Sequence, residues 1–250
     1  MTTVHIFHTN DFHNHLKPDQ AAKIREARQA HPDSLLLDSG DAISAGNVGV
    51  RPGGEPILDL MSETGYDAMT MGNREFHVAA ALLRHKIANA RFPVLCANVR
   101  WKEDAGEPLP VSPSLARTLP SGVTVGIIGV TVPMVTERMA AKALSAFLFD
   151  DPVAVVSRHA EELRPKVDVL IALTHIGLRQ DERLAAACPL LDVIIGGHSH
   201  DVISEPHIVA DVPILQAGWF GHYYGHTEVQ PREGARRAIV TDRLERIKES

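Results

Sequence analysis

The stretch LDVIIGGHSH, residues 191–200, decides how the rest of the chain is interpreted. It begins as a short apolar run rich in β-branched residues, which is typical of a strand buried on both faces. Two glycines end the run, and His198 and His200 follow them. Because a double glycine lets the backbone turn sharply and approach other groups closely, this pattern predicts a strand that delivers imidazoles to one edge of a sheet.

Apolar runs of the same kind recur along the chain, with helical patterns between them. Strands are predicted at residues 4–9, 34–38, 66–71, 92–99, 123–131, 167–174 and 213–218, and helices at 17–31, 55–65, 78–90, 151–165 and 178–188. This alternation predicts an α/β fold with parallel strands. The tail, residues 226–247, alternates like an antiparallel hairpin that turns at residues 232–234, so the sheets are expected to be mixed. Residues 102–120 are rich in proline and polar side chains, which indicates an excursion outside the core.

Length and composition bound the kind of protein. The chain has 250 residues, of which 44% are hydrophobic, enough for a large core. No linker divides it, and we expect a single domain over residues 1–250. The net charge is −6 and the sequence contains no Lys/Arg-rich block, which argues against a nucleic-acid polymer or an anionic membrane surface as the main partner.

The cellular location is predicted from the expected lack of a disulfide, of a signal peptide and of a membrane-spanning segment. The two cysteines, Cys96 and Cys188, lie in short apolar runs and are expected to be buried free thiols, consistent with a reducing compartment. The first residues show no signal-peptide pattern, and no apolar stretch is long enough to span a membrane. We therefore expect a cytoplasmic protein.

Polar residues collect where five of the predicted strands end. They are Asp11 and His13, Asp41, Asn73, His175, and His198 with His200. In α/β sheets, ligands bind outside the carboxyl ends of the strands, so these side chains should converge although they are far apart in the sequence. Any one of them alone has an ordinary explanation as a turn, cap or hydrogen-bonded residue. The set together predicts a metal site.

The predicted ligand set is too large for one ion. If Asp41 bridges two ions, Asp11, His13, Asp41 and His200 would hold one, and Asp41, Asn73, His175 and His198 the other. Nitrogen and oxygen ligands without thiolate suit Mn, Fe, Co or Zn better than magnesium or calcium. Two divalent ions and two aspartates leave a site charge of about +2. Such a site attracts a small-molecule phosphate ester and can turn a bridging water into an attacking hydroxide at neutral pH.

These motifs resemble those of the calcineurin-like metallophosphoesterases, and within them the 5′-nucleotidase branch. The matching phrases are HTNDFHNHL, MGNREF, THIG, IIGGHSH and QAGWFGHYYG, and the resemblance extends to about residue 230. It implies a four-layer αββα sandwich with two mixed sheets, two metal ions, and hydrolysis of a nucleotide or a related phosphomonoester or cyclic diester. It also implies a C-terminal domain that we expect this chain to lack. A homo-oligomer or a partner protein would then complete the pocket.

The sequence departs from the branch at one motif, which usually is GNHEFD. Arg74 and His77 stand at the altered positions. Arginine cannot act as a general acid, but its paired donors suit a phosphoryl group. We expect Arg74 to bind the substrate and stabilise the transition state, with Asn73 assisting and His175 contacting the substrate, and His77 to donate the proton. In the alternative, Arg74 pairs with an acidic neighbour such as Glu75, and His77 caps the next helix.

Two other functions stay open. A protein of this fold could keep its metal ligands and act as an inactive scaffold or a phosphate sensor, or it could hydrolyse a sulfur ester. The remaining histidines, His5, His31 and His226 among them, are interpreted as ordinary packed or surface residues.

Overall fold

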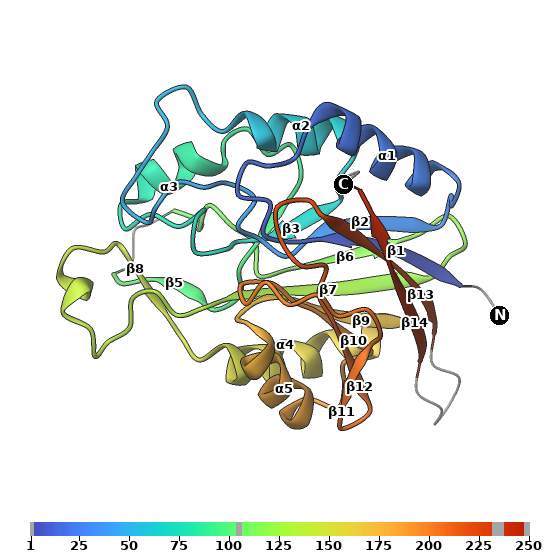
Figure 1. Ribbon diagram of the computed structural model, residues 1–250. Coiled ribbons are helices and arrows are strands. Elements are labelled where there is room, and N and C mark those ends of the chain that lie inside the picture. Colours follow the sequence, from blue (N-terminus) through green and yellow to red (C-terminus); the bar gives the residue numbers. More distant parts are fainter. Residues whose placement is uncertain (1–2, 104–106, 232–237, 248–250) are drawn as a thin grey trace.

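The computed structural model describes residues 3–103, 107–231 and 238–247. Figure 1 shows four layers: helices α1 to α3 lie on one side, helices α4 and α5 on the other, and two sheets pack between them. The predicted fold class, a sandwich of two mixed sheets between helices, is confirmed.

The first sheet has the strand order β14-β13-β1-β2-β3-β4. Its parallel strands are β1 (Val4–Thr9), β2 (Ser34–Asp38), β3 (Ala68–Thr70) and β4 (Val94–Leu95), and its antiparallel strands are β13 (Tyr223–Gln230) and β14 (Ile239–Arg246). The helices over it are α1 (Pro18–Gln29), α2 (Pro56–Thr64) and α3 (Ala80–Ile87). The predicted hairpin therefore forms from β13 and β14, while its predicted turn at residues 232–234 lies outside the described residues.

The second sheet has the order β11-β12-β10-β9-β7-β6. Its strands are β6 (Ser114–Thr118), β7 (Thr124–Thr131), β9 (Val169–His175), β10 (Val193–Ile195), β11 (His207–Val209) and β12 (Val212–Leu215). The helices over it are α4 (Pro152–Leu163) and α5 (Leu178–Ala187). The four central strands are parallel, and β6 and β11 are antiparallel edges.

Side chains of the central strands alternate between two apolar layers. Leu35 and Leu37 of β2 pack between the sheets, whereas Leu36 packs under the helices. In β9, Ile171 and Leu173 face the first sheet, while the alternate residues Leu170 and Ala172 face α4 and α5. Because each strand is buried on both faces, every such leucine or isoleucine contributes about 1.5–3 kcal/mol. This alternation holds the strand ends in register, and with them the loops that carry the polar residues.

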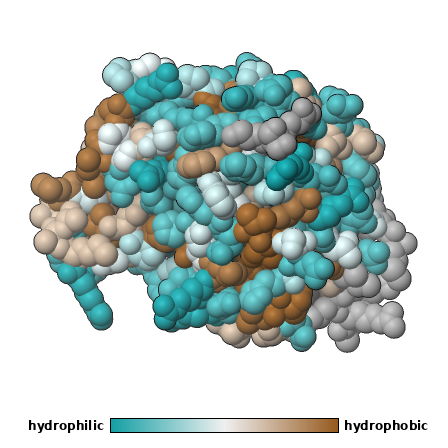
Figure 2. Space-filling view, in the orientation of Figure 1, coloured by the Kyte–Doolittle hydropathy of each residue, from teal (hydrophilic) through white to brown (hydrophobic). Residues whose placement is uncertain are grey.

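The structure differs from the sequence prediction at the edges. Part of the predicted excursion forms β6, whose residues are half-buried or exposed, so polar side chains are tolerated there. The predicted strand at 92–99 is only β4, and the chain then forms β5 (Val99–Trp101), which pairs with β8 (Phe147–Phe149) in a separate small sheet. Short 3₁₀ turns lie at Ala140–Ala143 and Arg164–Lys166. None of the helices in the described part of the chain is long and apolar enough to cross a membrane. The face drawn in Figure 2 is largely hydrophilic with apolar patches between.

Candidate metal centre

The loops that follow the strands hold five of the seven predicted ligands in an unusual backbone conformation. Asp11, Asp41 and His200 have φ values of 54°, 54° and 62°, and His13 and His198 are also left-handed. Such conformations are costly for residues with side chains and persist where the surroundings hold them, which is common at functional sites. Here neighbouring loops supply the restraint: the Asp11 amide donates to Gly40 O at 2.9 Å, and the His13 amide donates to Asp41 O at 2.9 Å.

Two glycines allow the loops after β2 and β3 to touch. A Cβ atom at Gly40 would lie 2.6 Å from the Gly72 nitrogen, and one at Gly72 would collide with the Asp41 backbone. Only residues without side chains permit this approach. The contact brings Asp41 and Asn73, which follow the two glycines, to the same edge of the sheet.

Asp11, His13 and His200 form the first of two candidate ligand groups. His13 Nε2 lies 3.1 Å from His200 Nε2, and Asp11 Oδ1 lies 3.2 Å from the latter atom. The other carboxylate oxygen of Asp11 accepts hydrogen bonds from Asn10 Nδ2 at 2.8 Å and from the His198 amide at 2.9 Å, which fixes its orientation. Asp11 Oδ1 itself is buried and accepts no hydrogen bond. A buried carboxylate oxygen without a donor, facing two imidazole nitrogens, fits a cation.

Asp41, Asn73, His175 and His198 form the second group. His175 Nδ1 donates to Ser39 O at 2.6 Å, which leaves Nε2 with its lone pair 3.4 Å from Asp41 Oδ1 and 3.3 Å from Asn73 Oδ1. His198 Nδ1 lies 3.0 Å from the same Asn73 oxygen. An imidazole whose second nitrogen donates to a carbonyl is the usual form of a metal ligand. Asp11, Asp41 and His175 also offer ligand atoms within 4.8 Å of one another, so the two groups adjoin.

The charges at this edge favour a cation. Burial opposes protonation of His175, but the Asp41 and Asp11 carboxylates outweigh it and raise the pKa of His175 to about 10. Burial likewise opposes the charge on Asp41, yet His175 keeps the pKa of Asp41 below its ordinary value. The Asp11 carboxylate raises the pKa of His200. The same negative potential that holds a proton here would hold a metal ion in its place. The donor set and its charge therefore fit the predicted ions.

Comparison with known proteins places the chain in a family. Residues 4–202 match the calcineurin-like phosphoesterases. The chain belongs to that family. YunD of Bacillus subtilis, an uncharacterized metallophosphoesterase, is 27% identical over an alignment of 238 positions that covers 90% of this chain and 49% of that protein. A snake venom 5′-nucleotidase from Gloydius brevicauda is 31% identical over an alignment of 264 positions that covers 90% of this chain and 44% of that protein. The resemblance inferred from the motifs is confirmed.

The fold has a close counterpart among solved structures. The 5′-nucleotidase precursor from Thermus thermophilus superposes with a TM-score of 0.81 at 24% identity, covering 98% of this chain and 54% of that one. This likeness is one of fold alone. The chain spans about half the length of the curated relatives it matches.

Glu75 lies beside the candidate metal centre, and the sequence did not indicate its function. Its carboxylate accepts hydrogen bonds from the backbone amides of Gly72 at 2.8 Å, Asp41 at 3.0 Å and Ile43 at 3.2 Å. Burial and the Asp41 charge raise the pKa of Glu75 to about 7. Glu75 thus clamps the loop that presents Asp41. The sequence offered one general indication: the backbone amides of a tight loop, such as the one after β2, need a hydrogen-bond acceptor, which a nearby carboxylate can supply.

Arg74 lies at the mouth of the phosphoesterase site. Its amide donates to Asp41 Oδ1 at 2.7 Å, and its Nε lies 3.8 Å from Asp41 Oδ2. The side chain is 42% exposed and borders a pocket of about 360 Å³. The ion-pair partner of Arg74 among the described residues is therefore Asp41, whereas Glu75 is taken up by backbone amides. The pocket is lined by His13, His15, Ser44, Arg74, His200 and Phe220.

The structure does not bring His77 to this pocket. The ring is buried, and its Nδ1 accepts a hydrogen bond from the Ala79 amide at 3.0 Å, at the start of α3. Burial lowers the pKa of His77, and the Val48 backbone lies against the ring. These contacts match the alternative interpretation, in which His77 caps the helix, because they engage the ring with backbone groups.

Proposed function

We propose that this member of the calcineurin-like phosphoesterases is a metal-dependent hydrolase of small phosphate esters, and that residues 1–250 act as a single catalytic domain. The observation that carries the proposal is the convergence of two nitrogen and oxygen ligand groups at one sheet edge, with Asp11 Oδ1 buried and without a hydrogen-bond donor. A nucleotide or a related monoester or cyclic diester is the proposed substrate class, in keeping with the names of the relatives.

Two divalent ions, of Mn, Fe, Co or Zn, are the proposed cofactors. Asp41 would be shared between them, as the neighbouring positions of the two groups suggest. When bound, such ions supply positive charge for phosphoryl oxygens and lower the pKa of a water molecule. The remaining parts of the reaction fall to side chains of this chain.

Arg74 is the proposed substrate anchor. A guanidinium beside the ligand groups can donate two parallel hydrogen bonds to phosphoryl oxygens, and its charge favours the dianion of a monoester. Asn73 directs its oxygen toward His175 and His198, so its amide nitrogen is available to donate to the substrate. His175 is proposed to contact the substrate from the floor of the site. Since His77 is engaged elsewhere, we do not assign it the proton transfer.

With cations bound at the ligand groups, the lining of the pocket suits an anion. The described residues that line it include Arg74 and three histidines and contain no carboxylate. A pocket of about 360 Å³ lies within the range of roughly 300–1,000 Å³ that holds small molecules. The cytoplasmic location and a homo-oligomer or partner protein beside this pocket stay predictions.

The test is hydrolysis of chromogenic phosphate mono- and diesters by protein stripped of metal and reloaded with Mn²⁺, Zn²⁺, Co²⁺ or Mg²⁺. We expect turnover to require metal and to be abolished in Asp41→Asn. Arg74→Ala should lose activity on the order of a hundred-fold, as for removal of one donor that stabilises transition-state charge. Arg74→Lys, which keeps the charge but not the paired donors, should fall between.

The control is His226→Gln, which alters a histidine far from the ligand groups and should leave turnover unchanged. Tight metal binding without turnover on any ester would contradict the proposal and favour the scaffold or phosphate-sensing function. Turnover that persists in Arg74→Ala would remove Arg74 from the mechanism and leave the metal centre in place.

A further inference from the structure

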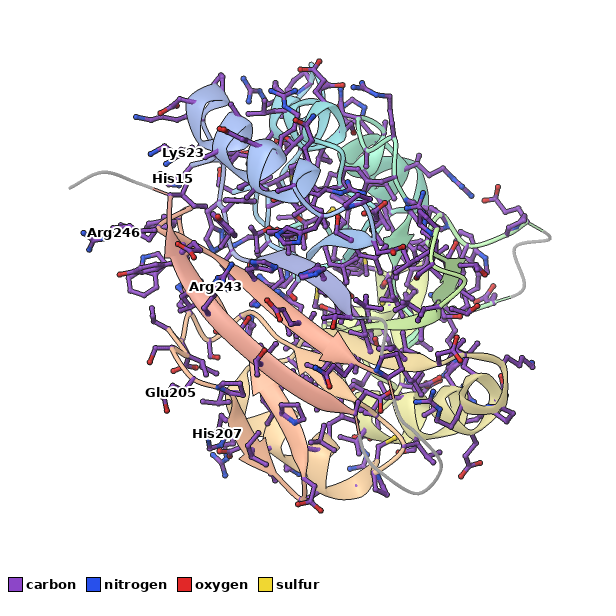
Figure 3. All side chains as sticks on the ribbon, turned by 90° about the vertical axis from the view of Figure 1, so that its right-hand side faces the viewer. His15, Lys23, Glu205, His207, Arg243 and Arg246 are labelled. Carbon is purple, nitrogen blue, oxygen red and sulfur yellow. The ribbon has the colours of Figure 1, made fainter. Side chains whose placement is uncertain are left out.

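The pocket at the metal centre has an aromatic wall that the proposed reaction does not use. His15 and Phe220 stack with ring centroids 4.2 Å apart and an interplanar angle of 29°. Both rings line the same pocket as Arg74 and Ser44. One part of the pocket therefore offers a cation and a hydroxyl, and another offers stacked π surfaces. His15 is exposed and reaches the surface beside α1 (Figure 3).

Phe220 has a backbone conformation that a bulky residue seldom adopts, and neighbouring groups hold it there. Its φ is 55°, which is uncommon for a bulky side chain. The Phe220 amide donates to Asp11 O at 2.9 Å, so this conformation is tied to the residue that carries the first ligand group. The next residue, Gly221, is also left-handed and packs so closely on Phe12 that a Cβ would lie 3.3 Å from that ring. A strained, well-anchored aromatic ring at the mouth of a site is a functional candidate.

His15 is anchored on the same segment. Its Nδ1 donates to Phe12 O at 3.1 Å, and its amide donates to the same oxygen at 2.8 Å. Asn14, between them, donates from its side chain to Ser44 Oγ at 2.8 Å. Residues 11–15 thus carry two of the proposed metal ligands, position the hydroxyl and support the aromatic pair. The distance between the ligand groups and the aromatic wall is therefore fixed by a short piece of chain.

We propose that the stacked pair of His15 and Phe220 is the subsite for the leaving group, and that it selects phosphate esters whose leaving group carries a planar aromatic or heteroaromatic ring. This deepens the proposed function and rests on it. The phosphoryl group would be held at Arg74 and the ligand groups. Among the described residues that line this pocket, His15 and Phe220 then remain to contact the rest of the ester. A π surface favours a flat ring over an aliphatic group of similar size, because stacked rings gain more than buried area alone.

The test measures binding rather than turnover, with non-hydrolysable phosphonates on the metal-loaded protein by isothermal titration calorimetry. Methylphosphonate reports the anion site alone, and phenylphosphonate adds a ring directly on phosphorus. A nucleoside 5′-phosphonate places a ribose between ring and phosphorus, and so distinguishes an aryl from a nucleoside leaving group. We expect phenylphosphonate or the nucleoside phosphonate to bind about ten-fold tighter than methylphosphonate, as one stacked ring allows.

Phe220→Ala should reduce the ratio of the two affinities, ring-bearing probe over methylphosphonate, to nearly one, while methylphosphonate binds as before. Phe220→Tyr should retain the ratio. His15→Gln, at an exposed position that tolerates exchange, should lower it in the same direction, and Phe220→Leu keeps the volume without the ring if Phe220→Ala fails to fold. Ile208→Ala, at an exposed apolar residue outside this pocket, is the control.

If methylphosphonate binds and neither ring-bearing probe gains affinity, or if the preference survives in Phe220→Leu and His15→Gln, the subsite is overturned and the proposed hydrolase stands. If no phosphonate binds, the proposed function fails, and this inference fails with it.

Discussion

Histidines gather at both ends of strand β1, but only one of the two groups has the surroundings that a metal site needs. His5, near the start of β1, lies against His31 and His226, and their ligand atoms are within 4.8 Å of one another. Asp11 and His13, beyond the end of β1, meet His200 within the same distance. By proximity alone the two groups are equal. The difference lies in what surrounds the imidazoles.

Two histidines of the group at the start of β1 are hydrogen-bonded without an ion. Arg243 of β14 (Figure 3) donates to His226 Nδ1 at 2.8 Å, so a neutral imidazole carries its hydrogen on Nε2. That nitrogen lies 3.0 Å from His5 Nδ1 and donates to it. A metal ligand has the opposite polarity, since its second nitrogen donates to an acceptor. The other group has a buried carboxylate oxygen instead of an arginine. Charge and hydrogen-bond polarity, rather than the number of histidines, distinguish a metal site from a packed cluster.

Removing the carboxylate from the first ligand group should have the largest effect. Asp11→Asn keeps the shape but removes the charge, so metal affinity should fall by more than about a hundred-fold, because even residues behind the ligands are worth ten- to a hundred-fold. Competition with a fluorescent chelator measures this affinity. His226→Gln should bind the same number of ions as the parent. Loss of an ion in His226→Gln, or full affinity in Asp11→Asn, would abolish the distinction between the two groups.

Glu75 supports the loop that carries Asp41, and its removal should rank second. In Glu75→Gln an amide group would face the Asp41, Gly72 and Ile43 backbone donors, and the loop presenting Asp41 would loosen. We expect metal-dependent turnover to fall by about ten- to a hundred-fold. Glu55→Gln, at another buried glutamate that precedes α2, is the matched control and should remain close to the parent. Equal rates in the two variants would show that Glu75 does not position Asp41.

The sequence predicts the parts of the molecule that depend on local pattern. The buried parallel strands follow from continuous apolar runs, and the candidate metal ligands follow from their position just after those strands. Edge strand β6 could not be predicted in this way, because its exposed side chains carry no apolar pattern and its strand structure comes from pairing with β7.

Other features of the site depend on distant partners. The clamp at Glu75 depends on which amides lie across a glycine contact, and the aromatic wall depends on a left-handed Phe220 bonded to Asp11. The satisfied state of His226 depends in the same way on Arg243, which is 17 residues away in the sequence and on the next strand. Contacts of this kind are set by tertiary structure and leave no local signature.

Arg243→Met should make the group of His5, His31 and His226 bind metal ions more tightly. It removes the cation at His226 Nδ1 and frees that imidazole to change tautomer. Removing a unit charge next to a divalent ion is worth at least about 1.4 kcal/mol, so Zn²⁺ should bind at this group at least about ten-fold tighter. Arg246→Met is the matched control, because Arg246 lies on the same strand over the Tyr223 ring. Titration of both variants with Zn²⁺ checks this, and no gain over Arg246→Met would mean that Arg243 is not what keeps ions away.

The smallest expected effect is on stability against pH. Burial, Arg243 and the neighbouring histidines lower the pKa of His226 to about 4, well below the ordinary value of 6.5. Because protonation then favours the unfolded chain, the free energy of unfolding should fall as the pH drops from 7 to 5. After allowance for solvent screening the share of His226 is about 1 kcal/mol. Urea unfolding of metal-stripped protein at the two pH values measures it. His226→Gln, which cannot titrate, should lose less stability over the same interval. An equal loss in both proteins would show that His226 is not held neutral by its neighbours, and the contrast with the carboxylate-rich group would then rest on Asp11 alone.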